Sequence, residues 1–195
     1  MPRKPREFVD GGIYHVFNRG NNRNEVFLSP SHYAYFLNLL GVAIKKFNIS
    51  LFHYCLMPNH FHFLLRIQAK EDMSSFMHWL QLGYARYFKS HYKTTGHIFE
   101  ERFRSPRISE ESYYLQCGRY IERNPVKAKI VQDAWGYKYS SAAYYALGTK
   151  DPLVTPNLYY LEMGESESQR QVKYRDFLLL EEPYAPMIEE GLLAY

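Results

Sequence analysis

The stretch LMPNHFHFLL, residues 56–65, constrains the fold more than any other part of the chain, because its second half alternates regularly. In a β-strand, successive side chains point to opposite faces of the sheet. One face of this strand would carry two histidines and a leucine: His60, His62 and Leu64. The other face would carry only large apolar groups: Phe61, Phe63 and Leu65. The pattern predicts a strand with one face in the core and one face that presents two imidazoles about 6–7 Å apart.

The histidine pair has two interpretations when it is considered alone. An H-x-H strand can place two histidines on a solvated sheet face, or it can supply part of a metal site, since imidazole is a common metal ligand. The residues that follow are apolar, and the chain has no HExxH motif of a zinc hydrolase. Other residues must therefore decide between packing and chemistry.

The segments around this strand predict the order strand, helix, strand, strand, helix, strand, helix. The predicted strands cover residues 11–20, the two arms of a hairpin over 50–67 that turns at Met57-Pro58-Asn59, and an irregular strand over 96–108. Three helices are predicted. The first follows a cap at Ser31, the second runs from 72 to 92, and the third runs from about Ser109 to Asn124, before Pro125. This order is typical of the split βαβ arrangement, an α+β sandwich of the ferredoxin-like or RRM-like type with a mainly antiparallel sheet.

Charge is distributed unevenly along the chain. Residues 151–195 carry three basic and nine acidic residues, a net charge of −6, whereas residues 1–150 carry 21 basic and 11 acidic residues, a net charge of +10. Aromatic residues make up 17% of the chain, so the basic part suits a polyanion whose bases stack on aromatic rings, namely nucleic acid. We expect one domain over residues 1–150 and an acidic C-terminal appendage of unknown role over residues 151–195.

The sequence also predicts a cytoplasmic protein without a membrane span. No run of about 18 or more apolar residues occurs. The basic N-terminal residues MPRKPREF lead into no apolar segment of a secretory signal. Cys55 and Cys117 are far apart and form no CxxC pair, which favours a reducing compartment over a disulfide scaffold or a zinc ribbon.

A second pair of polar residues occurs near the end of the third predicted helix, in GRYIERNPVKA (118–128). Tyr120 and Asn124 are four residues apart and would lie one turn from each other on one helical face. A tyrosine beside a side-chain amide can offer a nucleophile and a metal ligand together. Considered singly, however, Tyr120 fits a core or interface position, and Asn124 before Pro125 fits the N-cap of a new turn.

Taken together, these features are more specific than each alone. HFH in a strand hairpin and Tyr-x-x-x-Asn on a later helix, within a basic split-βαβ domain, resemble the HUH superfamily of single-strand DNA nucleases. Within it, the chain is most similar to the single-tyrosine transposases, and among these to the REP-associated tyrosine transposases, relatives recruited to short palindromic repeats. The matching segments run in family order over about residues 10 to 145: IYHVFNRGNNRNEVF, YCLMPNHFHFLL, GHIFEERFRS, RYIERNPVKA and YKYSSAAYY. The last fifty residues match nothing in the family.

The resemblance implies an HUH endonuclease fold and a reaction. His60, His62 and Asn124 would hold a divalent metal, Mg²⁺ or Mn²⁺, that polarises the scissile phosphate. Tyr120 would attack this phosphate and leave a 5′-phosphotyrosine and a free 3′-hydroxyl. Because tyrosine ordinarily titrates near pH ~10, it needs the ion or nearby arginines to become a competent nucleophile. The choice of metal comes from the family, since imidazole by itself favours zinc and other late metals.

The implied substrate is single-stranded DNA that contains a hairpin, because nicking requires an unpaired strand that enters the site. Candidate DNA-binding residues lie on the loop after the first strand and on the segment that would flank the site: Arg19, Asn21, Asn22, Arg23, Arg102, Arg104 and Arg107. Each arginine considered singly also fits a solvated surface charge. The resemblance leaves the oligomeric state open, as a monomer or as a homodimer that shares tyrosine helices.

Three alternatives compete with this interpretation. The first is a domesticated DNA-binding protein that keeps hairpin recognition with weak or no strand transfer. The second is a metal-dependent phosphodiesterase in which water replaces Tyr120 as the nucleophile, and a covalent protein–DNA adduct would separate it from the main interpretation. The third is an RRM-like RNA binder with the same strand order, but HFHFLLRI lacks the aromatic pattern that such a domain uses to stack bases.

Overall fold

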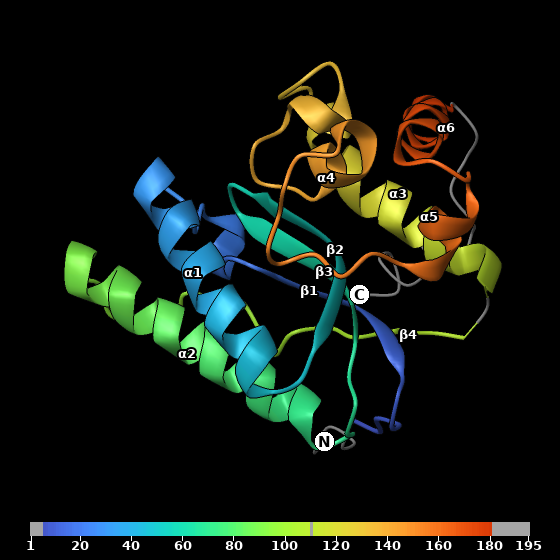
Figure 1. The fold of residues 1–195 in the computed structure, drawn as a ribbon. Helices are drawn as coiled ribbons and strands as arrows, with labels where there is room; N and C mark the ends of the chain where they lie inside the picture. The colour runs from blue at the N-terminus through green and yellow to red at the C-terminus, as the bar shows by residue number, and fades with distance from the viewer. Residues whose placement is uncertain (1–5, 110, 181–195) are drawn as a thin grey trace.

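The computed structural model of the chain describes residues 6–109 and 111–180. In these residues, four antiparallel strands form one sheet in the order β2-β3-β1-β4. The strands are β1 (Ile13–Arg19), β2 (Ser50–Met57), β3 (His60–Arg66) and β4 (Arg107–Ile108). The predicted α+β architecture with an antiparallel sheet is therefore confirmed, and β2 and β3 form the predicted hairpin (Figure 1).

Helices cover both faces of the sheet (Figure 1). One face is covered by α1 (Pro30–Lys46) and α2 (Asp72–Tyr92), and the other by α3 (Glu111–Lys127). A short 3-10 turn, η1 (Asn21–Arg23), follows β1. The elements after α3 are η2 (Ala134–Gly136), α4 (Ala142–Leu147), α5 (Leu158–Glu162) and α6 (Glu167–Leu179).

The alternation in β3 separates two hydrophobic clusters, as its sequence predicts. Phe61, Phe63 and Leu65 are fully buried in the cluster formed with α1 and α2. Leu64 is buried in the cluster formed with α3, on the same face as the two histidines. The space between the sheet and α3 thus contains both apolar packing and imidazoles, and it is where a site can form.

Three local predictions differ from the structure. The N-cap of α1 is Ser29, with Pro30 in the first turn, rather than Ser31. Residues 96–108 form no continuous strand: only Arg107–Ile108 pair with β1, together with single bridges at Phe99 and Arg104. The helix predicted to stop before Pro125 continues through it to Lys127.

The segment after residue 150 packs closely on the rest of the chain where it is described. Tyr160 and Tyr174 are buried in a third hydrophobic cluster with α4. The Thr155 amide donates to the Leu51 carbonyl, and Ser141 pairs in the same way with Tyr54, so these segments cover the outer edge of β2. The domain boundary at residue 150 stays a prediction, but the residues beyond it share a core with α3 and α4.

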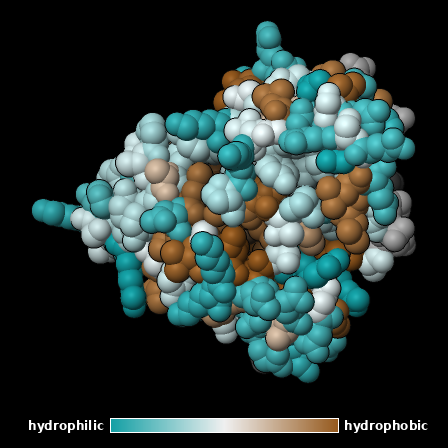
Figure 2. All heavy atoms as spheres, in the orientation of Figure 1, coloured by the Kyte–Doolittle hydropathy of each residue, from teal (hydrophilic) through white to brown (hydrophobic). Residues whose placement is uncertain are grey.

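In this orientation hydrophobic residues gather near the centre of the surface, and hydrophilic residues occupy much of its edge (Figure 2). A groove of about 540 Å³ lies between α1 and residues 149–153 and is lined in part by Leu37, Val42 and Leu153. Among the described residues, no helix combines the length and the apolar character that crossing a membrane requires. Cys55 and Cys117 are both buried and free.

Candidate active site

The sheet brings three histidines together on the face that α3 covers. His60 and His62 are on β3, and their ring centroids are 5.0 Å apart. His15 on the neighbouring strand β1 lies beside them, with its Nε2 2.9 Å from Nδ1 of His62. His15 is 2% and His62 4% exposed, whereas His60 is half-buried at the end of the strand. The two predicted histidines are therefore neighbours in a mostly buried cluster.

Asn59 and His15 contact the Nδ1 atoms of the two predicted histidines and orient their rings. The Asn59 amide nitrogen donates to the Arg23 carbonyl, so the Asn59 oxygen faces Nδ1 of His60 at 2.6 Å. His60 then carries its proton on Nδ1, which leaves a lone pair on Nε2. If Nδ1 of His62 donates to His15, Nε2 of His62 is likewise free to bind a metal. Such partners commonly fix the tautomer of metal-binding histidines.

Burial keeps these imidazoles neutral. Desolvation lowers the pKa of His15 to about 3 and that of His60 to about 4, although a side-chain hydrogen bond with Asn124 partly offsets the shift of His60. The pKa of His62 lies well below 6.5 because of desolvation and the neighbouring charges of His60 and His15 in their protonated forms. Neutral imidazole is the form that binds metal ions, so the cluster is ready for ligation at neutral pH.

We expect this cluster to make folding sensitive to acid. The pKa values of these histidines are lower in the folded state than in the unfolded state. Below pH 6.5 the unfolded chain therefore binds more protons than the folded chain, and the free energy of unfolding decreases as the pH decreases. Between pH 7 and pH 5 the expected loss is about 2 kcal/mol for each histidine that stays neutral in the folded state. Urea unfolding at pH 7 and pH 5, in the presence of a chelator, measures this loss in the free energy of unfolding. The same free energy at both pH values would contradict the prediction, and His78→Gln, at an exposed position on α2, should leave the dependence unchanged.

Asn124 does not cap a new turn, and this corrects the interpretation that its position before Pro125 favours. Pro125 lacks an N–H, so the Ile121 carbonyl cannot receive its usual helical hydrogen bond from residue 125. The Asn124 Nδ2 instead donates to the carbonyls of Ile121, at 3.2 Å, and of Tyr120, at 2.9 Å. The helix thereby continues through the proline. Because the amide nitrogen faces the backbone, the Asn124 oxygen is the atom that remains for the histidines.

Tyr120 lies against the histidine cluster one turn before Asn124. Its ring meets His62 edge-on, with centroids 5.9 Å apart, and meets His15 at 6.0 Å. The Lys127 ammonium is 4.6 Å from the centroid of the Tyr120 ring. The phenol is half-buried, and it lines the same pocket as His60 and His62. A single chain therefore brings the tyrosine, both histidines and the amide together.

The pocket at this site has a volume of about 450 Å³ and is lined by residues of β1, the hairpin turn, β3, α3 and the segment 100–104. Three of the predicted DNA-binding residues line it: Arg19, Arg102 and Arg104. The other four lie outside its lining: Asn21, Asn22 and Arg23 on η1, and Arg107 on β4. The Glu100 and Glu101 side chains line the pocket as well, so its basic character is partly offset.

Arg19 is held by Glu100, whose Oε2 accepts from Nε at 3.0 Å and from Nη2 at 2.8 Å. Both side chains are about 40% exposed, 41% for Arg19 and 39% for Glu100, so the pair contributes less than ~1 kcal/mol to stability. We expect Glu100→Gln to tighten binding of single-stranded DNA about 2–5-fold and to steepen its salt dependence by about 0.7 in log–log slope. Fluorescence anisotropy across 50–200 mM NaCl measures both, with the exposed Glu71→Gln as control. Unchanged affinity would show that Arg19 does not meet the DNA.

Three residues of the site are missing from the sequence-based prediction: His15, Asn59 and Lys127. His15 shares its strand face with Phe17 and Arg19, so the alternation in IYHVFNR places an imidazole on one face of β1. Only the β1–β3 register, with Phe17 opposite His62 and Arg19 opposite His60, shows that this face joins the H-x-H face. Asn59 and Lys127 carry no comparable signal, since each resembles an ordinary turn or surface residue.

The residues present suit a divalent cation. Across the described residues, no three His, Cys, Asp or Glu side chains are grouped to hold a metal, so a site here depends on the Asn124 amide as a third protein ligand. The Asn124 side chain raises the pKa of His60, and both residues line the same pocket, so the Nε2 lone pair of His60 and the Asn124 oxygen are available there together. Both atoms are electron-pair donors of the kind that a divalent cation binds. Mixed nitrogen and oxygen ligands fit Mn²⁺ better than they fit Mg²⁺, which prefers oxygen.

Comparisons with known proteins identify the family and the fold of the chain. No curated protein sequence matches the chain. Its fold is that of a REP-associated tyrosine transposase solved bound to a REP hairpin, with a TM-score of 0.63 and 18% identity over 81% of this chain and 93% of the other. A candidate transposase of Deinococcus radiodurans R1 has 19% identity, a TM-score of 0.44, and coverage of 67% of this chain and 94% of the other. The family model described as "Transposase IS200 like" matches residues 8–124, more than half of the chain. The protein therefore belongs to the IS200-like transposase family.

Proposed function

We propose that this protein nicks and rejoins single-stranded DNA at hairpin sites of palindromic repeats, with Tyr120 as the nucleophile. The observation that carries the proposal is the edge-on contact of Tyr120 with His62, 5.9 Å between centroids, in a pocket shared with His60 and Asn124. Membership of the IS200-like transposase family supports the reaction class. A related fold solved with a REP hairpin supports the choice of DNA substrate.

In the proposed reaction, Tyr120 Oη forms a bond to the scissile phosphorus while the bond from phosphorus to the 3′-oxygen breaks. The phenol loses one proton and the departing 3′-oxygen gains one, so the products are a 5′-phosphotyrosine and a free 3′-hydroxyl. Attack by a 3′-hydroxyl on the phosphotyrosine reverses the step and rejoins DNA. Because the phosphodiester energy is kept in the covalent bond, rejoining requires no ATP, and the chain has no phosphate-binding GxxxxGK[ST] loop.

His60, His62 and Asn124 are the residues that would hold a divalent cation, Mg²⁺ or Mn²⁺. When bound, the cation would supply charge neutralisation on the phosphate oxygens. The protein side chains have separate tasks. Asn59 and His15 orient the two imidazoles, and Arg102 and Arg104 line the approach along which a phosphate backbone would run.

The test is a denaturing gel of the protein incubated with a single-stranded hairpin that is labelled on the side retained by Tyr120. A labelled band at the combined mass of protein and DNA, lost on chelation and restored by Mn²⁺ or Mg²⁺, is the expected result. Cleavage without this band would indicate attack by water. Hairpin binding without cleavage, across several palindromic substrates, would indicate a domesticated DNA-binding protein.

A further inference from the structure

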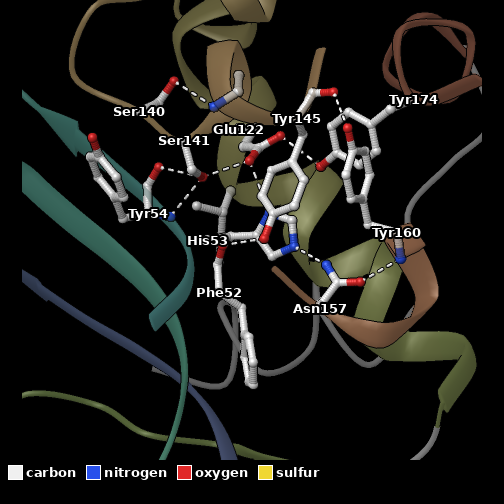
Figure 3. A network of polar contacts seen from close by, with 12 residues as sticks. Phe52, His53, Tyr54, Glu122, Ser140, Ser141, Tyr145, Asn157, Tyr160 and Tyr174 are labelled. Carbon is white, nitrogen blue, oxygen red and sulfur yellow. Dashed lines mark hydrogen bonds and ion pairs between the residues drawn. The ribbon is translucent and has the colours of Figure 1, made fainter. Parts of the chain in front are cut away.

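A buried polar network joins α3 to β2, α6 and the start of α4 and is not part of the pocket (Figure 3). Its centre is Glu122 of α3, which is fully buried. We propose that Glu122 is a positioning residue whose network holds α3 on β2 and α6, and so fixes Tyr120 beside the histidines of its own chain. This inference rests on the proposed function, because it assigns the network to the orientation of the Tyr120 nucleophile.

Three donors from three different parts of the chain bind the Glu122 carboxylate. Its Oε1 accepts from Ser141 Oγ at 2.6 Å and faces Nδ1 of His53 at 2.9 Å. Its Oε2 accepts from the Tyr174 hydroxyl at 2.7 Å. His53 is on β2, Ser141 precedes α4 and Tyr174 is on α6, so one carboxylate connects α3 to all three. A buried carboxylate requires such donors to compensate for lost hydration.

The Asn157 side chain, at the N-cap of α5, sets the direction of the two hydrogen bonds that His53 makes. The backbone N–H of Tyr160 donates to the Asn157 Oδ1 at 2.7 Å, so the Asn157 Nδ2 must be the atom that faces His53 Nε2, at 2.9 Å. His53 therefore accepts at Nε2 and carries its proton on Nδ1, from which it donates to Glu122. These contacts fix the tautomer of His53 and the orientation of the Asn157 amide, and hydrogen bonds with fixed directions favour one geometry of the network.

The network is not itself a second catalytic centre. A serine, a histidine and a glutamate meet here, but Ser141 contacts the carboxylate rather than the imidazole that would have to activate it. Ser141, His53 and Glu122 all have an exposure of 0%, so no substrate reaches them. The arrangement therefore has a structural role, in which it connects α3 to β2, α4 and α6.

Glu122 holds α3 from the side opposite to Tyr120. Residues two apart on a helix point about 200° apart, whereas residues four apart share a face. Tyr120 and Asn124 thus face the histidine cluster, and Gly118 and Glu122 face His53. A Cβ at Gly118 would lie 2.7 Å from Nε2 of His53, so only glycine lets α3 approach β2 this closely. A bulge between Leu51 and His53 turns the His53 ring towards α3.

The end of α6 is attached to the same helix by a second set of contacts. Arg119 and Arg123 both donate to the Leu180 carbonyl. The Arg119 guanidinium also lies 5.5 Å from the Phe177 ring centroid. The end of α6 therefore contacts α3 at two residues, Arg119 and Arg123, which share one helical face next to that of Glu122. Rotating α3 by about 10° would move the Tyr120 hydroxyl by about 1.5 Å, enough to spoil an in-line attack.

Tyr174→Phe tests the inference, because it removes only the hydroxyl that reaches Glu122. Its matched control is Tyr160→Phe, which removes a hydroxyl in the same cluster that donates instead to the Tyr145 carbonyl. With hairpin DNA at saturating concentration, we expect Tyr174→Phe to slow adduct formation at least tenfold while the hairpin Kd stays within twofold. We expect amide hydrogen exchange in residues 118–127 to become faster in this variant. Tyr160→Phe should match wild type in rate, Kd and exchange of that helix.

A second pair of variants distinguishes the loss of a contact to Glu122 from a general loss of structure. Ser141→Ala removes another donor to Glu122, and Ser140→Ala removes a neighbouring hydroxyl that donates to the Tyr137 carbonyl. Adduct formation at the wild-type rate in both Tyr174→Phe and Ser141→Ala, with unchanged exchange in α3, would overturn the inference. Equal slowing in all four variants would also overturn it, since it would indicate general loss of structure. If wild type forms no adduct, the proposed function fails, and hydrogen exchange in the 118–127 helix alone decides whether Glu122 anchors it.

Discussion

Replacing Tyr120 by phenylalanine should abolish the covalent protein–DNA adduct and lower strand cleavage by at least about 10³-fold. Phenylalanine keeps the ring, and with it the edge-on contacts to His62 and His15 and the packing against Lys127. Only the hydroxyl oxygen is lost, so the hairpin Kd should stay within about twofold. Denaturing gels measure the adduct, and fluorescence anisotropy measures the affinity.

The matched control is Tyr113→Phe, which changes another half-buried tyrosine of α3 that is outside the pocket lining. Its adduct yield should equal that of wild type. Cleavage that persists in Tyr120→Phe, with a 5′-phosphate instead of a protein-linked end, would show that water is the nucleophile. Loss of hairpin binding together with cleavage would instead indicate that the hydroxyl mainly holds DNA.

Glu122→Ala should lower the free energy of unfolding by about 3–5 kcal/mol. Truncation leaves the His53, Ser141 and Tyr174 donors without their acceptor in a site that water does not reach, and it adds a cavity between α3 and α6. Urea unfolding measures the change. Glu162→Ala, at an exposed position of α5, should change the free energy of unfolding by less than about 0.5 kcal/mol.

Glu122→Gln separates the hydrogen bonds from the charge. The amide oxygen can accept from His53 and Ser141, and the amide nitrogen can donate to the Tyr174 oxygen, so only the hydroxyl hydrogen of Tyr174 loses its acceptor. The expected loss is about 1–2 kcal/mol, clearly smaller than for alanine. A glutamine variant as unstable as the alanine variant would show that the charge, rather than the hydrogen-bond geometry, holds the network together.

The local pattern of the chain was sufficient to predict most of the sheet and the position of its core. Alternation in HFHFLL assigns the faces of β3, and apolar residues at helical spacing give α2 its observed bounds of Asp72 and Tyr92. These signals are reliable because burial acts on neighbours in sequence with a fixed period of two or 3.6 residues. The spacing of Tyr120 and Asn124 predicts a shared helical face for the same reason.

The irregular parts did not follow from local pattern. Residues 96–108 look like a strand, yet only two of them pair regularly with β1, because pairing depends on a distant edge and not on their own sequence. Pro125 predicts a helix end, yet the Asn124 amide replaces the missing donor and α3 continues. In each case a contact that local propensity does not describe outweighs the local preference.

The sequence by itself determined the strand hairpin, the two faces of β3 and the helical pairing of Tyr120 with Asn124, since each depends on residues a few positions apart. Only the tertiary structure decided that His15 joins the histidine cluster, 47 residues before His62, and that Tyr174 reaches Glu122 across 52 residues. The physical reason is that hydrogen bonds between distant segments depend on how the sheet register and helix packing bring those segments together. The periodicity within one segment does not predict which distant segments it will contact.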